Sequence, residues 1–154
     1  MKEAFLFVHP TLGVLGILGA LWVFVEALRV DDTRLHRMRL VSLIVPALFL
    51  LTWVSGGLWD SFFYEADRMV MEKGPWAVIG NTTMELKEHL FVVVLLLALY
   101  LPILTFSFDL RRTTARAPTL TASALIVLLG LVMEGAGATL SGAVHVGMAT
   151  LNGS

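Results

Sequence analysis

Four long apolar segments dominate the chain, and polar residues separate them from one another. They cover about residues 5–28, 40–59, 88–108 and 118–146. An α-helix must contain ~20 mostly apolar residues to cross a hydrocarbon layer ~30 Å thick, because it rises ~1.5 Å per residue. The pattern therefore predicts an all-α integral membrane protein. We expect an up-and-down four-helix transmembrane bundle that forms a single domain over residues 1–154, with a loop at about 60–84.

Composition supports this prediction and narrows the chemistry. Hydrophobic residues make up 57% of the chain and charged residues only 15%, which is too little polar surface for a water-soluble domain. The net charge of −1 disfavours nucleic-acid binding, which requires a concentrated basic face. The chain has no cysteine, so disulfides, thiolate metal sites and thioether-linked haem are excluded.

The positive charges predict the orientation in the membrane. The links between the first and second and between the third and fourth apolar segments hold seven of the eleven lysine and arginine residues: Arg29, Arg34, Arg37, Arg39, Arg111, Arg112 and Arg116. Short loops rich in lysine and arginine stay in the cytoplasm. Both termini and the 60–84 loop are then expected outside, and a prokaryotic inner (plasma) membrane is the expected location. The first segment has only Lys2 before it and an apolar core too long for a signal peptide, so we expect it to be retained.

Three of the four histidines are expected at the same membrane boundary. His9 begins the first segment, His89 begins the third, and His145 ends the fourth, which runs in the opposite direction. Because both termini are predicted outside, all three residues reach the outer face and are candidate metal or haem ligands. The alternative is that they are amphipathic anchors at the membrane interface.

Small residues and a carboxylate accompany these histidines. Gly13 and Gly16 follow His9 at i+4 and i+7, and Gly142 precedes His145 by three residues, so each histidine shares a helical face with glycine. Such faces could make room for a flat cofactor, or they could allow close helix–helix packing. Glu85 precedes His89 by four residues and is expected to orient its ring.

Glu134 is the carboxylate that lies deepest in a predicted helix. A charge at mid-membrane costs ~2.5–3.5 kcal/mol on insertion scales, so the group is expected to face the bundle interior and to be neutral. It precedes His145 by eleven residues, close to three turns, which puts both on one face about 16 Å apart. We interpret it as a proton relay or a hydrogen-bond partner of a cofactor. A structural acid bonded to Thr52 or Ser55 is the alternative.

Haem b is the cofactor that best fits these residues. It requires one or two imidazoles from facing helices, a slot lined by small residues, and polar groups for its propionates. In architecture and histidine placement the pattern resembles small four-helix membrane b-type cytochromes. The resemblance implies electron transfer near the outer face, with quinone and an external electron-transfer protein as candidate partners besides membrane lipid. A quinol-linked oxidoreductase or an electron-transfer subunit would fit this pattern.

Two other functions stay open at this stage. The same histidines with nearby carboxylates could bind non-haem iron, copper or zinc, although no short metalloenzyme motif is present. The chain could also be a cofactor-free accessory subunit of a larger membrane complex or form a homo-oligomer, with its glycine-rich fourth segment as the interface.

Overall fold

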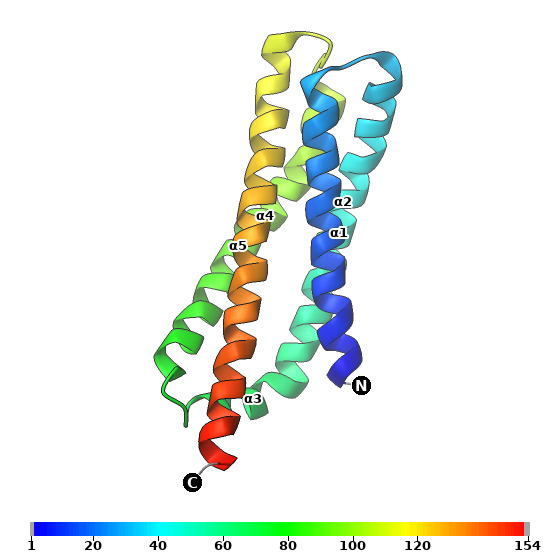
Figure 1. The fold of residues 1–154 in the computed structure, drawn as a ribbon. Coiled ribbons are helices and arrows are strands. Elements are labelled where there is room, and N and C mark those ends of the chain that lie inside the picture. The colour runs from blue at the N-terminus through cyan, green and yellow to red at the C-terminus, as the bar shows by residue number, and fades with distance from the viewer. Residues whose placement is uncertain (1, 153–154) are drawn as a thin grey trace.

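A computed structural model describes residues 2–152 of the chain, and the side chains of residues 6–151 (Figure 1). These residues are almost entirely helical. The elements are α1 (Lys2–Leu28), α2 (Asp32–Trp59), the π-helix η1 (Asp60–Tyr64), α3 (Glu65–Met71), α4 (Ala77–Ser107) and α5 (Thr113–Asn152). Four helices are long and apolar enough to cross a membrane, so this part of the sequence prediction is confirmed.

The four long helices form an antiparallel bundle. α1 packs against α2 and α5, and α4 packs against the same two helices from the opposite corner. The α1–α2 and α4–α5 links lie together at what we call the arginine end, whereas both termini and α3 lie at the opposite, terminal end (Figure 1).

All four long helices begin earlier than the apolar pattern indicates, and the difference is largest for α2 and α4. α2 begins at Asp32 and not near residue 40, because the Asp31 carboxylate caps its first turn by accepting a hydrogen bond from the Arg34 backbone N–H at 2.8 Å. α4 begins at Ala77 and not near residue 88. In both cases the additional turns carry polar or charged side chains, which hydropathy assigns to loops although they continue the helix.

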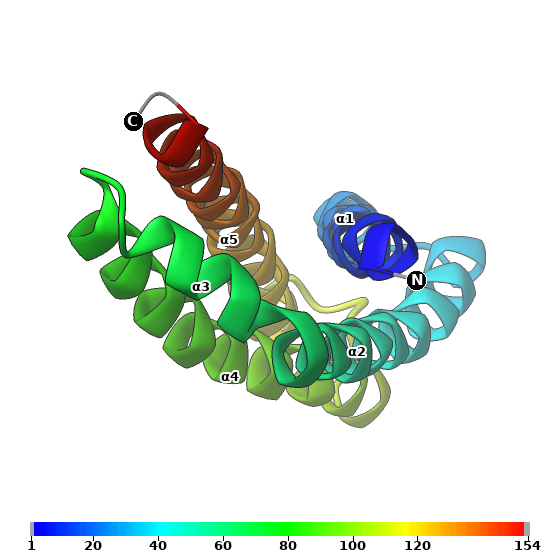
Figure 2. The same ribbon diagram turned by 90° about the horizontal axis from the view of Figure 1, so that it is seen from below.

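The expected 60–84 loop is therefore largely helical. α2 continues through η1 into α3, and only residues 72–76 form a turn before α4. α3 packs on α5, where the backbone carbonyl of Val70 contacts the helix at Gly147 so closely that no side chain would fit there. Met71 is fully buried against Leu140 and Val144 of α5. This packing holds α3 across the terminal end of the bundle (Figure 2).

Arginine side chains join the elements at the arginine end. The Arg116 guanidinium donates hydrogen bonds to the carbonyl oxygens of Leu110, Leu28 and Arg111 at 2.7, 3.2 and 3.0 Å. It thereby links the α1–α2 connection to the α4–α5 connection. Glu26 is buried, and its carboxylate pairs with the guanidinium of Arg37 at 2.9 Å. It does not pair with Arg29, which is closer in sequence.

The half of the bundle next to the arginine end is closely packed. Met38, Val45, Leu101, Leu104 and Ile126 are completely buried there. At the edge of this packed half, α1 and α5 are in close contact. Ile17 lies directly on Gly130, and a methyl group added to Gly130 would come within 2.6 Å of the Ile17 side chain. Beyond this contact the two helices diverge toward the terminal end (Figure 2), and their divergence sets the position of the cavity described next.

Candidate functional site

A cavity of about 860 Å³ occupies the terminal half of the bundle. All four long helices contribute to its wall, and Tyr64 and Asp67 border it from η1 and α3. Phe49, Ile17 and Gly130 form its inner limit, where the packed core begins. Its volume lies within the ~300–1,000 Å³ typical of sites for small molecules and cofactors.

His9 enters this cavity from the first helix. Its ring lies against Gly56 of α2, where a methyl group would come within 2.7 Å of the ring atom Cε1. The Nδ1 atom is 2.9 Å from the backbone carbonyl oxygen of Thr52. The glycine makes the close approach of helix and ring possible, and the hydrogen bond fixes the ring orientation.

The other two candidate histidines are separated from each other. His145 lines the cavity from α5, and its Nδ1 atom is 2.8 Å from the carbonyl oxygen of Ser141. His89 is exposed on α4, is not part of the cavity wall, and bonds through Nδ1 to the carbonyl oxygen of Glu85 at 2.7 Å. The interaction expected from the Glu85 carboxylate is thus made by its backbone.

All three hydrogen bonds fix the same tautomer of the histidine ring. A carbonyl oxygen can only accept, so Nδ1 must carry the hydrogen in His9, His89 and His145. In the neutral ring this leaves a lone pair on Nε2. A metal-bound histidine has this arrangement, with one ring nitrogen held by a carbonyl and the other free to coordinate.

Glu134 also reaches the cavity, from the middle of α5. Its Oε1 atom lies 3.0 Å from the position that a methyl group on Gly13 would occupy. The carboxylate therefore crosses to the surface of α1 one turn deeper than His9. No hydrogen bond joins it to Thr52 or Ser55 in the part of the chain that the structure describes: Thr52 donates to the Leu48 carbonyl oxygen and Ser55 to that of Thr52.

Of the three glycines predicted to line a cofactor slot, only Gly13 borders the cavity. Gly16 lies beneath the ring of Phe49, and a methyl group added to Gly16 would come within 3.0 Å of that ring. A methyl group added to Gly142 would lie 3.7 Å from the ring of Trp76. These two positions serve helix and side-chain packing. Gly137, which the sequence analysis did not single out as a site residue, borders the cavity beside Lys87.

Two nitrogen donors in the cavity wall are available to a ligand. Lys87 is half-buried, and its Nζ atom lies 3.5 Å from the position that a methyl group on Gly137 would occupy. The indole N–H of Trp59 is buried and has no hydrogen-bond partner among the described residues. A tryptophan at a helix end is usually an interfacial anchor, so sequence reasoning gave no signal that Trp59 would face inward.

No known protein family matches this chain. No family model, no curated protein and no solved structure is similar to it. Within residues 2–152, no group of three or more histidine, aspartate or glutamate side chains converges as a metal centre would require. The site must therefore be interpreted from its own geometry.

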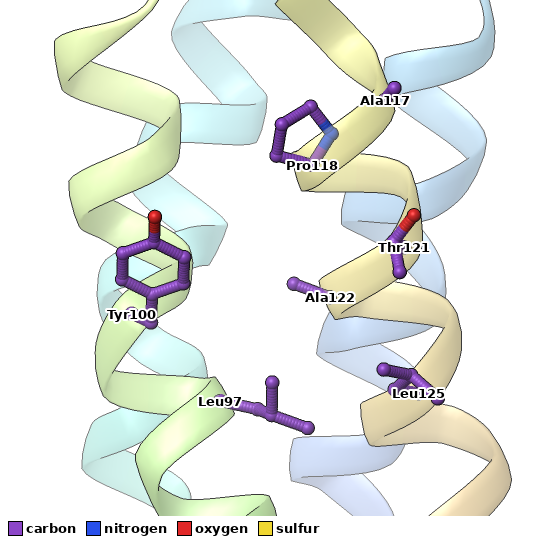
Figure 3. A pocket seen from close by; sticks show the side chains of 7 residues that line it. All are labelled: Leu97, Tyr100, Ala117, Pro118, Thr121, Ala122 and Leu125. Atoms are coloured by element: carbon purple, nitrogen blue, oxygen red, sulfur yellow. The ribbon is translucent and has the colours of Figure 1, made fainter.

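A second, shallower hollow lies between α4 and α5 near the arginine end (Figure 3). Leu97 and Tyr100 face Pro118, Ala122 and Leu125 across it. Its wall carries no charged group, and it opens at the surface of the bundle. It shares no lining residue with the cavity that His9 and His145 border.

Proposed function

We propose that the protein is a membrane b-type haem protein that transfers electrons, and that His9 and His145 would hold the haem iron. The observation that carries this proposal is the pair of imidazoles lining one cavity from facing helices, each with Nδ1 bonded to a carbonyl and Nε2 free. His89 has the same tautomer but lies outside the cavity, so it is not one of the residues that would hold the iron.

The cavity wall fits the rest of a haem as well. A flat macrocycle requires an apolar slot, and Leu6, Trp53 and Val144, which lie close in sequence to His9, Gly56 and His145, supply apolar cavity wall for it. Haem carboxylates require hydrogen-bond donors. The unpartnered indole N–H of Trp59 is one donor in the wall, and the Tyr64 hydroxyl is another. Arg68 is paired with Glu72 at 2.9 Å and does not line the cavity.

When bound, haem supplies a one-electron couple, and the protein's residues set its surroundings. The hydrogen bonds from Nδ1 to Thr52 and Ser141 hold both rings in place and increase the basicity of Nε2. The cavity lies in the terminal half of the bundle. An electron-transfer partner would therefore dock at the terminal end, which the positive-inside rule makes the outer, periplasmic face.

Optical spectra of the detergent-purified protein test the proposal directly. With haem supplied during expression, we expect a Soret band and α and β bands that sharpen on dithionite reduction. His9→Ala and His145→Ala should each abolish the low-spin spectrum, whereas His89→Ala, the matched control on an exposed histidine, should retain it. A featureless spectrum, or unchanged bands in the His9→Ala/His145→Ala double variant, would overturn the proposal.

Elemental analysis separates the alternatives if the spectrum is featureless. Stoichiometric zinc, iron or copper would favour the non-haem site, although only two histidines border the cavity. A metal-free, colourless protein that copurifies with other membrane proteins would favour the accessory subunit.

A further inference from the structure

The inner part of the cavity contains a charged pair that haem ligation does not use. Glu134 approaches Gly13 of α1, and Lys87 of α4 approaches Gly137. Gly137 follows Glu134 by three residues on α5, so the carboxylate and the ammonium group face the same side of that helix. Both groups line the cavity.

Neither group has a protein partner for hydrogen bonding. The carboxylate and the ammonium group attract each other electrostatically, yet no hydrogen bond or direct ion pair involves either of them in the described part of the chain. Half-buried charges in apolar surroundings are costly unless polar atoms form hydrogen bonds with them. A ligand that lies between the two groups would form hydrogen bonds with both.

The wall restricts the chemistry of that ligand. The ammonium group can only donate, and an ionised carboxylate can only accept, so the ligand needs an oxygen acceptor at one edge and a hydroxyl at the other. Phe91, Met133 and Ile17 surround the pair with apolar surface, which favours a flat ring between the two polar edges. A fatty-acid carboxylate would satisfy Lys87 but would place a second negative charge beside Glu134.

We propose that this part of the cavity binds the headgroup of a lipid-soluble quinol. One hydroxyl oxygen of the quinol accepts from Lys87, and the hydroxyl on the opposite edge donates to Glu134. The cavity wall includes Leu6, Val92 and Met148, which are exposed on the surface of the bundle, so a ligand can enter from the hydrocarbon. Binding itself is independent of haem; only its use in electron transfer rests on the proposed function.

Quenching of tryptophan fluorescence by a decyl-substituted benzoquinol tests this site. Trp53 and Trp59 border the cavity and would report binding in the detergent-purified protein. We expect saturable quenching, and we expect Lys87→Met and Glu134→Gln each to weaken binding roughly 10–100-fold, as loss of a hydrogen bond to a charged group does. Lys73→Met and Glu85→Gln are the matched controls, because both residues are exposed outside the cavity, and they should bind normally.

Three results would overturn the quinol site: quenching of the unaltered protein that rises without saturation, affinity that survives both cavity substitutions, or displacement of the quinol by a fatty acid at equal concentration. The first and third results use only the unaltered protein, so they are decisive even if a variant fails to fold. A Soret band without quinol binding would refute this site alone. Saturable binding by a protein without a Soret band would refute the haem proposal alone.

Discussion

Replacing Gly56 by alanine perturbs the site by displacing the ring of His9 from the surface of α2. The added methyl group would lie 2.7 Å from Cε1 and 2.8 Å from Nδ1 of His9. Neither distance is tolerable, so the ring must move away from α2. The movement breaks the 2.9 Å hydrogen bond from Nδ1 to the Thr52 carbonyl oxygen, and the ring loses the tautomer and the orientation that this bond imposes.

The cost follows from the lost hydrogen bond. The clashing atoms are at the end of the His9 side chain, which can move into the cavity, so the clash is relieved and the lost hydrogen bond costs roughly 0.5–1.5 kcal/mol. Substitution of glycine by alanine in a helix contributes about 1 kcal/mol in the opposite direction. Gly57 is the matched control, because no atom outside its own helix lies within 4 Å of the position of its added methyl group. Gly57→Ala should therefore gain stability, and Gly56→Ala should be less stable than Gly57→Ala by about 0.5–1.5 kcal/mol.

Reversible unfolding in mixed detergent micelles, followed by circular dichroism, measures this difference. If haem is bound, Gly56→Ala should also shift or weaken the low-spin spectrum while Gly57→Ala leaves it unchanged. Equal stability of the two variants would refute the close contact between His9 and α2 and, with it, the hydrogen-bonded ring on which the tautomer argument depends.

Three further outcomes are expected elsewhere in the bundle. Gly147→Ala should detach α3 from α5 and make the 72–76 turn more sensitive to proteolysis. Gly135→Ala, whose added methyl group meets open space, should remain resistant to proteolysis. Equal resistance of the two variants would contradict the packing of α3. Arg116→Lys should lower the free energy of unfolding by about 1–3 kcal/mol, because lysine cannot reproduce the forked hydrogen bonds, and the same change at Arg112, whose side chain is 80% exposed, should have almost no effect. In intact cells a membrane-impermeant maleimide should label Lys73→Cys but reach Arg112→Cys only after permeabilisation; the reverse pattern would show that the predicted orientation is wrong.

The helices were predictable from sequence, because crossing a membrane requires long apolar runs that little else produces. Their limits were not. Asp31 and Asp32 begin α2 within a segment that hydropathy assigns to a loop, since a charged turn forms a helix as readily as an apolar one once it extends beyond the hydrocarbon. The π-helical continuation of α2 into α3 likewise has no signal in the apolar pattern.

The site was only partly predictable, because helical periodicity shows which residues share a face but not which face points inward. On α4 the residues that border the cavity are Met84, Lys87, Glu88, Phe91 and Val92, spaced as one helical stripe. His89 follows Lys87 by two residues and thus lies about 200° around the helix. Only the packing of α4 against its neighbours determines that the lysine, and not the histidine, faces the cavity.

The closely packed half of the bundle has an electrical consequence. The cavity reaches Glu134 from the terminal end, while buried side chains such as Leu101 and Ile126 fill the bundle beyond it. Carrying a unit charge across the whole membrane takes about 2.3 kcal/mol per 100 mV. A proton that enters from the terminal end and stops at Glu134 crosses only part of that field. If Glu134 exchanges protons from the terminal end of a membrane-spanning bundle, the membrane voltage would change its protonation by correspondingly less than it would for a charge moved across the whole membrane.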